Sequence, residues 1–247
     1  MTNLPSTEQA RAGAILSAAA LGFGLGEVLA LVLVTAVAAG LGALNGVSGL
    51  TSTVPHTWWA NALGLFGLWI GMIGAVHWAA HQGSMPWPSD AWRWRSWRDA
   101  GFVLVGVASQ FLVDLAYRPW HLHTLNAPVQ RLFGSTNALE FTLLALATGL
   151  VAPVVEECFF RATVFRALHG VTMKALPRGG TAVAIAISAL LFALAHGELV
   201  QIPGLFMIGV VLAVVYARVQ RVLPCVLVHV GFNLTTVGVL FSQRFGH

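Results

Sequence analysis

The stretch "ALEFTLLALATGLVAPVVEECFFRATVFRAL", residues 138 to 168, is apolar over more than the ~20 residues that a helix needs to cross a membrane. The whole chain of 247 residues has the same character, because 57% of it is hydrophobic and only 9% is charged. Soluble domains carry roughly 25% charged residues. So few charges could not solvate the surface of a soluble protein, and the sequence therefore predicts an integral membrane protein.

Further apolar runs predict more membrane helices, at residues 12–44, 60–80, 101–117, 180–199, 203–219 and 224–241. These runs do not alternate polar and apolar residues, as the strands of a membrane barrel would. We therefore expect an all-α fold, a polytopic transmembrane helical bundle around a catalytic cavity. It should have about seven to eight membrane helices, the eighth arising if the segment 138–168 breaks at Pro153. With no internal repeat, residues 1–247 are expected to form a single transmembrane domain.

The distribution of basic residues predicts the orientation of the chain. Alternate loops carry the basic groups: Arg11; Arg93, Arg95 and Arg98; Arg166, Lys174 and Arg178; and Arg218 and Arg221. The loops 45–58 and 200–202 have no Lys or Arg. The positive-inside rule then predicts a cytosolic N-terminus, with only Arg118 and Arg131 on the other side opposing it. We expect the bacterial inner membrane as the location.

Three charged residues lie together inside the quoted apolar stretch. Glu157 and Arg161 are four residues apart on a helix, where a carboxylate and a guanidinium can pair. Glu156 points about 100° away from Glu157 and is left to face a cavity. Pro153 suits the first turn of a helix, which would place both carboxylates near a helix N-terminus. On their own, these residues fit either a catalytic site or an ion network between helices.

Polar residues in later apolar runs favour catalysis. His196 ends the sequence "FALAH", and His229 and Asn233 lie one helical turn apart in "HVGFN". Polar side chains in membrane segments usually face the interior of the bundle. A carboxylate base, two imidazoles and a carboxamide are sufficient to activate water and to stabilise an oxyanion.

In order and spacing these residues resemble the CPBP intramembrane proteases, which include the CaaX prenyl endoproteases and bacteriocin-processing or immunity proteins. The resemblance covers roughly residues 140 to 241, with the family-like catalytic core at about 138–241. The matching positions are Glu156, Glu157 and Arg161; Phe192 and His196; and His229 and Asn233. Every motif position is filled, so nothing in the motifs predicts an inactive enzyme.

The resemblance implies a membrane-embedded endopeptidase. Glu156 would activate a water that His196 helps to hold, His229 and Asn233 would stabilise the oxyanion, and Glu157 with Arg161 would orient the site. The implied partners are the lipid bilayer and a membrane protein or lipidated peptide as substrate, and no nucleic acid.

The need for a metal is open at this point. If the enzyme needed zinc, Glu156, His196 and His229 would be the ligands. The chain has no His-Glu-x-x-His pair and Asn is a poor zinc ligand, so we expect no cofactor, with zinc as the alternative.

Other functions remain as alternatives. A non-catalytic membrane scaffold or bacteriocin-immunity protein could use the polar cluster to join helices, and a transporter could use a carboxylate as a proton relay. A rhomboid-like serine protease is suggested by "GVSG" at residues 46–49, but Thr-Ser-Thr-Val-Pro follows it. An aspartyl protease needs two membrane Asp residues, and only Asp114 lies in an apolar run; we expect it to pair with Arg118.

Several polar or aromatic features have no assigned catalytic role. The segment 85–99 interleaves Trp with Arg, which is typical of a cytosolic headgroup layer. His77 and His81 are spaced to share a metal but are expected to be interfacial, and His121 and His123 lack a third ligand. Glu27 lies deep in the first run without an evident partner. Cys158 and Cys225 are expected to be buried small hydrophobic residues.

Overall fold

A computed structural model describes residues 7–40, 57–81, 91–120, 127–134 and 136–246. The Gly-Val-Ser-Gly sequence at 46–49, residues 85–90 of the Trp- and Arg-rich segment, and His121 and His123 lie outside the described residues. The described part of the chain consists of helices joined by turns, without a strand. Its helices are α1 (Thr7–Gly40), α3 (Trp58–His81), η1 (Trp97–Ala100), α4 (Gly101–Tyr117), η2 (Arg118–Trp120), α5 (Ala127–Phe133), α6 (Ala138–Leu146), η3 (Ala147–Val151), α7 (Ala152–Phe159), η4 (Phe160–Phe165), α8 (Arg166–Ala175), α9 (Gly180–Ala195), η5 (Leu199–Gln201), α10 (Ile202–Val219) and α11 (Val222–Phe245).

The predicted membrane bundle is confirmed. Within the described ranges, 6 helices are long and apolar enough to span a membrane, and Gly180–Ala195 forms a shorter apolar helix. Large apolar side chains point outward from these helices, as on α4, where Leu104 is 70% exposed and Phe111 62%. Side chains of this kind are suited to contact lipid. The chain is an integral, multi-pass membrane protein.

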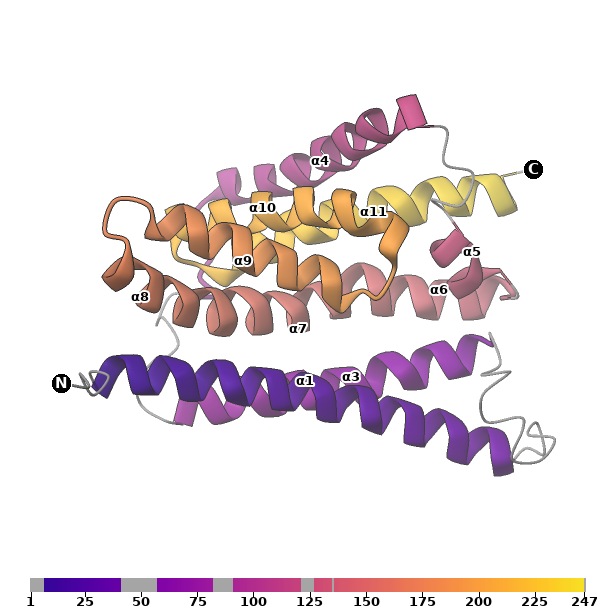
Figure 1. Ribbon diagram of the computed structural model, residues 1–247. Coiled ribbons are helices and arrows are strands. Elements are labelled where there is room, and N and C mark those ends of the chain that lie inside the picture. Colours follow the sequence, from indigo (N-terminus) through magenta and orange to yellow (C-terminus); the bar gives the residue numbers. More distant parts are fainter. Residues whose placement is uncertain (1–6, 41–56, 82–90, 121–126, 135, 247) are drawn as a thin grey trace.

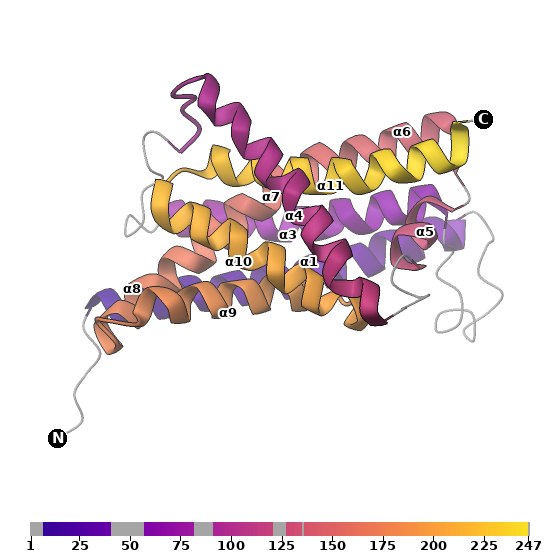
Figure 2. The same ribbon diagram turned by 90° about the horizontal axis from the view of Figure 1, so that it is seen from above.

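The helices are stacked in layers that run along one common direction (Figure 1). The helices α1 and α3 lie side by side as one layer, next to the long helix that runs from α6 to α8. Beyond it lie α9, α10 and α11. The outermost helix, α4, crosses α10 and α11 obliquely (Figure 2). The start of α1 and the end of α11 lie at opposite ends of the stack.

Glycines allow α1 and α3 to approach each other closely. A Cβ atom added at Gly22 would lie 2.7 Å from the carbonyl oxygen of Gly71, and one added at Gly67 would lie 2.5 Å from Ala30 Cα. Contacts this short leave no room for a side chain. Small residues of the Gly-Phe-Gly-Leu-Gly stretch at 22–26 thus allow close helix packing, as Gly22 shows.

The helix from Ala138 to Ala175 is continuous over 38 residues and does not break at Pro153, so it does not supply an eighth crossing. Two short π-helical segments, η3 and η4, interrupt its α-helical winding. Pro153 lies in the first turn of α7, as expected, but that turn follows η3 directly, and the Ala152 N–H already bonds to the Ala147 carbonyl. The carboxylates that follow are thus inside a helix. The expectation that they lie near an open helix N-terminus is wrong, because the π turn accommodates the proline without ending the helix.

The shortness of α9 brings its C-terminal end toward the middle of the bundle. It has 16 residues, about 24 Å of helix, and in both views it ends part-way along α11 (Figures 1 and 2). Pro203 and Pro224 each lie in the first turn of the helix that follows, α10 and α11. The sequence left open how His196 and His229 could lie at similar depth, and the short α9 is the physical reason that they can.

Candidate active site

Glu157 joins two other buried polar residues. On one side its Oε2 atom lies 2.9 Å from Nε of Arg161, one helical turn further on, and neither side chain is exposed. On the other side its Oε1 atom lies 3.0 Å from Nδ1 of His229 in α11. The predicted pairing of Glu157 with Arg161 is present, and the contact with His229 is a further one. Because a carboxylate only accepts hydrogen bonds, Nδ1 of His229 carries a proton here.

The guanidinium of Arg161 is held mostly by aromatic rings. Its terminal nitrogens Nη1 and Nη2 have no hydrogen-bond partner among the described residues. Its Cζ atom instead lies 4.8 Å from the centre of the Phe192 ring and 5.9 Å from that of Phe160. Aromatic faces attract cations, more strongly where water is excluded. The positive charge is therefore balanced by Glu157 and by two ring faces.

Glu156 lies on the other side of the His229 ring. Its Oε2 atom is 3.8 Å from Nε2 of His229, which is too far for a hydrogen bond. That oxygen is buried and has no hydrogen-bond partner in the described part of the chain, although the side chain as a whole is 14% exposed. A buried carboxylate oxygen without a partner is costly, and water is the usual partner in such a place. Glu156 is thus the carboxylate that can meet a water molecule.

His196 lies beside this cluster, separated from it by Phe192. The Phe192 ring centre is 4.8 Å from that of His196 and 5.5 Å from that of His229. Nδ1 of His196 is 2.8 Å from the Phe192 carbonyl oxygen, so this nitrogen is a donor and a neutral ring keeps Nε2 as an acceptor. Among the described residues His196 makes no hydrogen bond to Glu156. Their convergence on one water remains a prediction.

Asn233 is fixed by a carbonyl that Pro153 leaves free. In the π-helical winding of η3, the Thr148 carbonyl would accept from the N–H of residue 153, but a proline has none. The Asn233 side chain fills this vacancy, since its Nδ2 atom donates to the Thr148 oxygen at 2.9 Å. One N–H of the amide remains for another acceptor. Asn233 lies one turn beyond His229, but the structure does not bring it into contact with the two glutamates.

A close helix crossing supports the His229 position. A Cβ atom at Gly106 of α4 would lie 1.9 Å from the Val228 carbonyl oxygen, and one at Gly231 of α11 would lie 2.1 Å from that of Val103. Only glycines fit at this crossing, which is next to His229 in the chain. It fixes the distance between α4 and the helix that carries His229 and Asn233.

No metal centre is evident in the described ranges, where no three His, Cys, Asp or Glu side chains are grouped to hold an ion. Glu156, His196 and His229 do not fit zinc as their side chains stand. The rings of His77 and His81 pack edge to face, with centres 4.2 Å apart. Asp114 accepts a hydrogen bond from Gln110, at 2.9 Å.

The remaining singled-out residues have no assigned part in this chemistry. Glu27 is on the exposed part of the α1 surface. Cys158 and Cys225 are both free, and the latter is fully buried.

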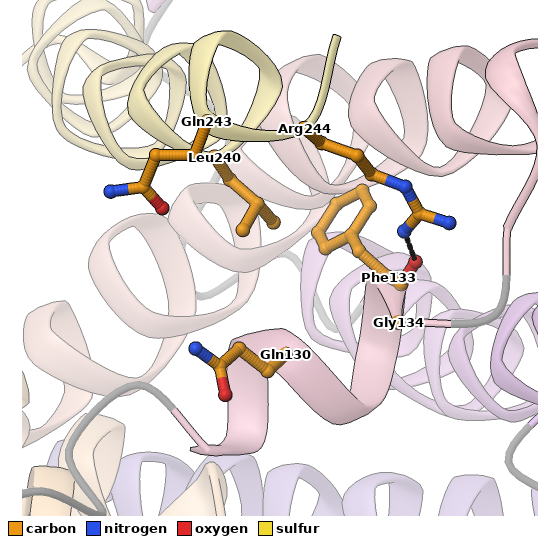
Figure 3. Close-up of a pocket in the computed structure, with 6 residues that line it drawn as sticks. All are labelled: Gln130, Phe133, Gly134, Leu240, Gln243 and Arg244. Carbon is orange, nitrogen blue, oxygen red and sulfur yellow. Dashed lines mark hydrogen bonds between the residues drawn. The ribbon is translucent and has the colours of Figure 1, made fainter.

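A surface pocket of about 550 Å³ lies where α5 meets the C-terminal end of α11 (Figure 3). It is lined by Gln130, Phe133, Gly134, Leu240, Gln243 and Arg244, none of which is a predicted site residue. The Arg244 guanidinium donates to the carbonyl groups of Phe133 and Thr136, which gives it a structural task at the end of α5. This pocket is therefore not the predicted site.

One family model matches the part of the chain that contains these residues. Residues 138–235 match the family model described as Type II CAAX prenyl endopeptidase Rce1-like. This match supports the predicted resemblance of the segment to the CPBP intramembrane proteases. The CPBP match covers less than half of the chain but includes all six predicted site residues. No curated protein and no solved structure matches the chain.

The motifs in the sequence did not indicate the roles of two residues, Phe192 and Thr148. Phe192 is a motif position, but only the structure shows that its ring contacts Arg161, His196 and His229. Thr148 acts through its backbone carbonyl, so its side chain could not have indicated it. The signal for this free carbonyl is Pro153, which lies five residues later inside a predicted helix and has no N–H to donate.

Proposed function

We propose that this protein is an intramembrane endopeptidase in which Glu156 activates water to hydrolyse a peptide bond of a membrane-associated or lipidated substrate. The family match supports a membrane protease in general. The observation that carries the proposal is the unequal setting of the two glutamates. Glu157 lies 2.9 Å from Nε of Arg161 and hydrogen-bonds to His229 at 3.0 Å. The buried Oε2 atom of Glu156 has no hydrogen-bond partner among the described residues and is 3.8 Å from Nε2 of His229.

The reaction needs one proton to move twice. The Glu156 carboxylate accepts a proton from water as the water oxygen forms a bond to the scissile carbonyl carbon. The carbonyl oxygen becomes an anion, and His229 and Asn233 donate hydrogen bonds to it. When the C–N bond breaks, Glu156 returns the proton to the departing nitrogen. The products are a carboxylic acid and an amine, and the acid then passes its proton to the amine, giving a carboxylate and an ammonium group. His196, with Nε2 as acceptor, holds the water.

The charge state of His229 follows from its two neighbours. Its Nδ1 proton is committed to Glu157, so it can donate from Nε2 only as an imidazolium. Two carboxylates, Glu156 and Glu157, balance an imidazolium and the Arg161 guanidinium. A cluster with no net charge is the least costly one to keep inside a membrane. In the proposed reaction His229 is therefore a cation that stabilises the oxyanion.

The proposed reaction uses no metal. Among the described residues no three His, Cys, Asp or Glu side chains are grouped to hold an ion, and side chains of the chain perform every proposed step. Treatment of the active protein with chelators tests the metal-free reaction against the zinc alternative.

The proposed orientation places the start of α1 in the cytosol of a bacterial inner membrane. It is supported by the basic residues at that end of the stack, where the turns α8–α9 and α10–α11 lie with Lys174, Arg178 and Arg218.

The test is cleavage of a farnesylated CaaX peptide by the purified chain in detergent, with products identified by mass spectrometry. The same peptide without the farnesyl group tests whether the lipid is required. A Glu156→Gln preparation, purified in the same way, reports contaminating proteases. If neither peptide is cut, intact and processed membrane proteins are compared in cells with and without the gene. Absence of any gene-dependent cleavage would favour the scaffold or immunity alternative.

A further inference from the structure

Residues 92–98, "WRWRSWR", form an exposed segment just before α4, here called the Trp–Arg segment. All seven residues are exposed, with Trp94 at 51% and Trp97 at 80%. Large aromatic side chains in water are costly, since a ring this size buries 150–250 Å² when covered. So much exposed tryptophan indicates that something else covers the segment.

The backbone of the Trp–Arg segment is held firmly at both ends. Asp99 is buried and accepts two hydrogen bonds from Arg221, both at 2.9 Å, and one from the Arg95 N–H at 2.8 Å. The Ala91 carbonyl accepts from the N–H groups of Val222 and Leu223, each at 3.0 Å. These contacts fix the segment against the first turn of α11. The exposed side chains therefore project from a preformed surface.

Within the described residues 91–100, the exposed charge is entirely positive. Arg93, Arg95 and Arg98 are exposed, and Asp99, the acidic residue of this described stretch, is buried and paired with Arg221. Arginine and tryptophan together favour the headgroup region of a bilayer, the ring lying at the apolar boundary and the guanidinium among phosphates.

We propose that the Trp–Arg segment is a binding surface for anionic phospholipid headgroups. Each arginine near an anionic surface should favour such a lipid over a zwitterionic one on the order of fivefold. Because Asp99 and Ala91 hold the segment on α11, the bound headgroups lie at the start of the helix that carries His229. The surface does not depend on the proposed protease activity, so the two can fail separately.

The experiment measures tryptophan quenching by brominated lipids in bilayers that contain the full chain. Brominated phosphatidylglycerol should quench the segment more strongly than brominated phosphatidylcholine, with a relative affinity of at least about fivefold. The quenching that is lost in the double variant Trp94→Phe/Trp97→Phe is the quenching that comes from the Trp–Arg segment. Raising the salt concentration should reduce the preference.

The decisive variant replaces Arg93, Arg95 and Arg98 by Gln, which should reduce the preference to nearly onefold. The matched control removes the same number of charges at the same end of the stack, through Lys174→Gln, Arg178→Gln and Arg218→Gln, and should retain it. Equal quenching by both lipids in the unmodified chain would overturn the proposal. So would equal losses in the two triple variants, because the preference would then belong to the whole face.

Discussion

Removing the charge of Glu157 should destabilise the protein more than removing that of Arg161. The Glu157→Gln variant removes the anion beside Nε and leaves a buried guanidinium whose Nη1 and Nη2 atoms have no hydrogen-bond partner in the described part of the chain. It also removes the anion from Nδ1 of His229, 3.0 Å away. In Arg161→Gln, by contrast, the Glu157 carboxylate keeps the His229 contact. The structure therefore predicts an unequal pair of losses.

The magnitude follows from burial and distance. Two unit charges 2.9 Å apart attract by about 6 kcal/mol at an effective dielectric constant of 20, before desolvation is subtracted. Breaking a buried pair by removing one partner costs about 3–5 kcal/mol. We expect Glu157→Gln at the upper end of this range and Arg161→Gln at the lower end. The double variant should cost about 2–3 kcal/mol less than the sum of the two single losses.

The assay is the free energy of unfolding in mixed micelles of a mild detergent and SDS, followed by helical circular dichroism. Glu140→Gln is the matched control, because Glu140 is on the same long helix and its capping box with Asn137 also accepts Gln. It should change stability by less than about 0.5 kcal/mol. Additive losses in the double variant would refute the coupling of Glu157 with Arg161. Single losses below about 1 kcal/mol would refute their burial as a charged pair.

Four other perturbations test separate parts of the structure. Gly106→Ala places a Cβ atom 1.9 Å from a backbone oxygen of α11, so it should lower the free energy of unfolding by at least about 1–3 kcal/mol and remove most activity. Gly24→Ala is the control: a Cβ atom there has no atom within 4 Å, so the variant should be neutral or stabilising. Pro153→Ala restores an N–H that competes with Asn233 for the Thr148 carbonyl, so turnover should fall about 2- to 10-fold without loss of melting temperature. Unchanged turnover would show that the Thr148 carbonyl does not position Asn233 for catalysis. Asp99→Asn should cost about 3 kcal/mol in the same unfolding assay by breaking its buried ion pair, and a loss below 1 kcal/mol would show that the pair is dispensable. Chelators should leave peptide cleavage unchanged, and activity lost on chelation and restored by stoichiometric zinc would contradict a metal-free reaction.

Features set by local periodicity were predictable from the sequence. Apolar runs gave the membrane helices, and the spacing of Glu157 and Arg161 gave their ion pair, because residues four apart on a helix are neighbours whatever surrounds them. The order of the polar motifs identified the family segment. Glu156 was distinguished from Glu157 by the same helical geometry.

Contacts between distant segments were not predictable in this way. The hydrogen bond from His229 to Glu157 joins residues 72 positions apart and depends on how α11 packs against α7. The Thr148 carbonyl is free only because η3 winds as a π-helix ahead of Pro153, and no periodicity of apolar residues indicates that winding. The depth of His196 depends on the early end of α9, which the apolar run 180–199 did not show.

The central claim is that Glu156 is the general base. The most direct measurement is the single-turnover rate of cleavage of a substrate that the unmodified chain cuts, compared between Glu156→Gln and the Glu140→Gln control on the same helix. The substituted glutamine keeps the volume of Glu156 but cannot accept the proton of water, so its rate should fall by at least ~10²-fold. Stability should be nearly unchanged, and the control should retain its rate. Normal cleavage by a folded Glu156→Gln variant, with activity lost instead in a stable Glu157→Gln variant, would contradict the assignment of the two glutamates.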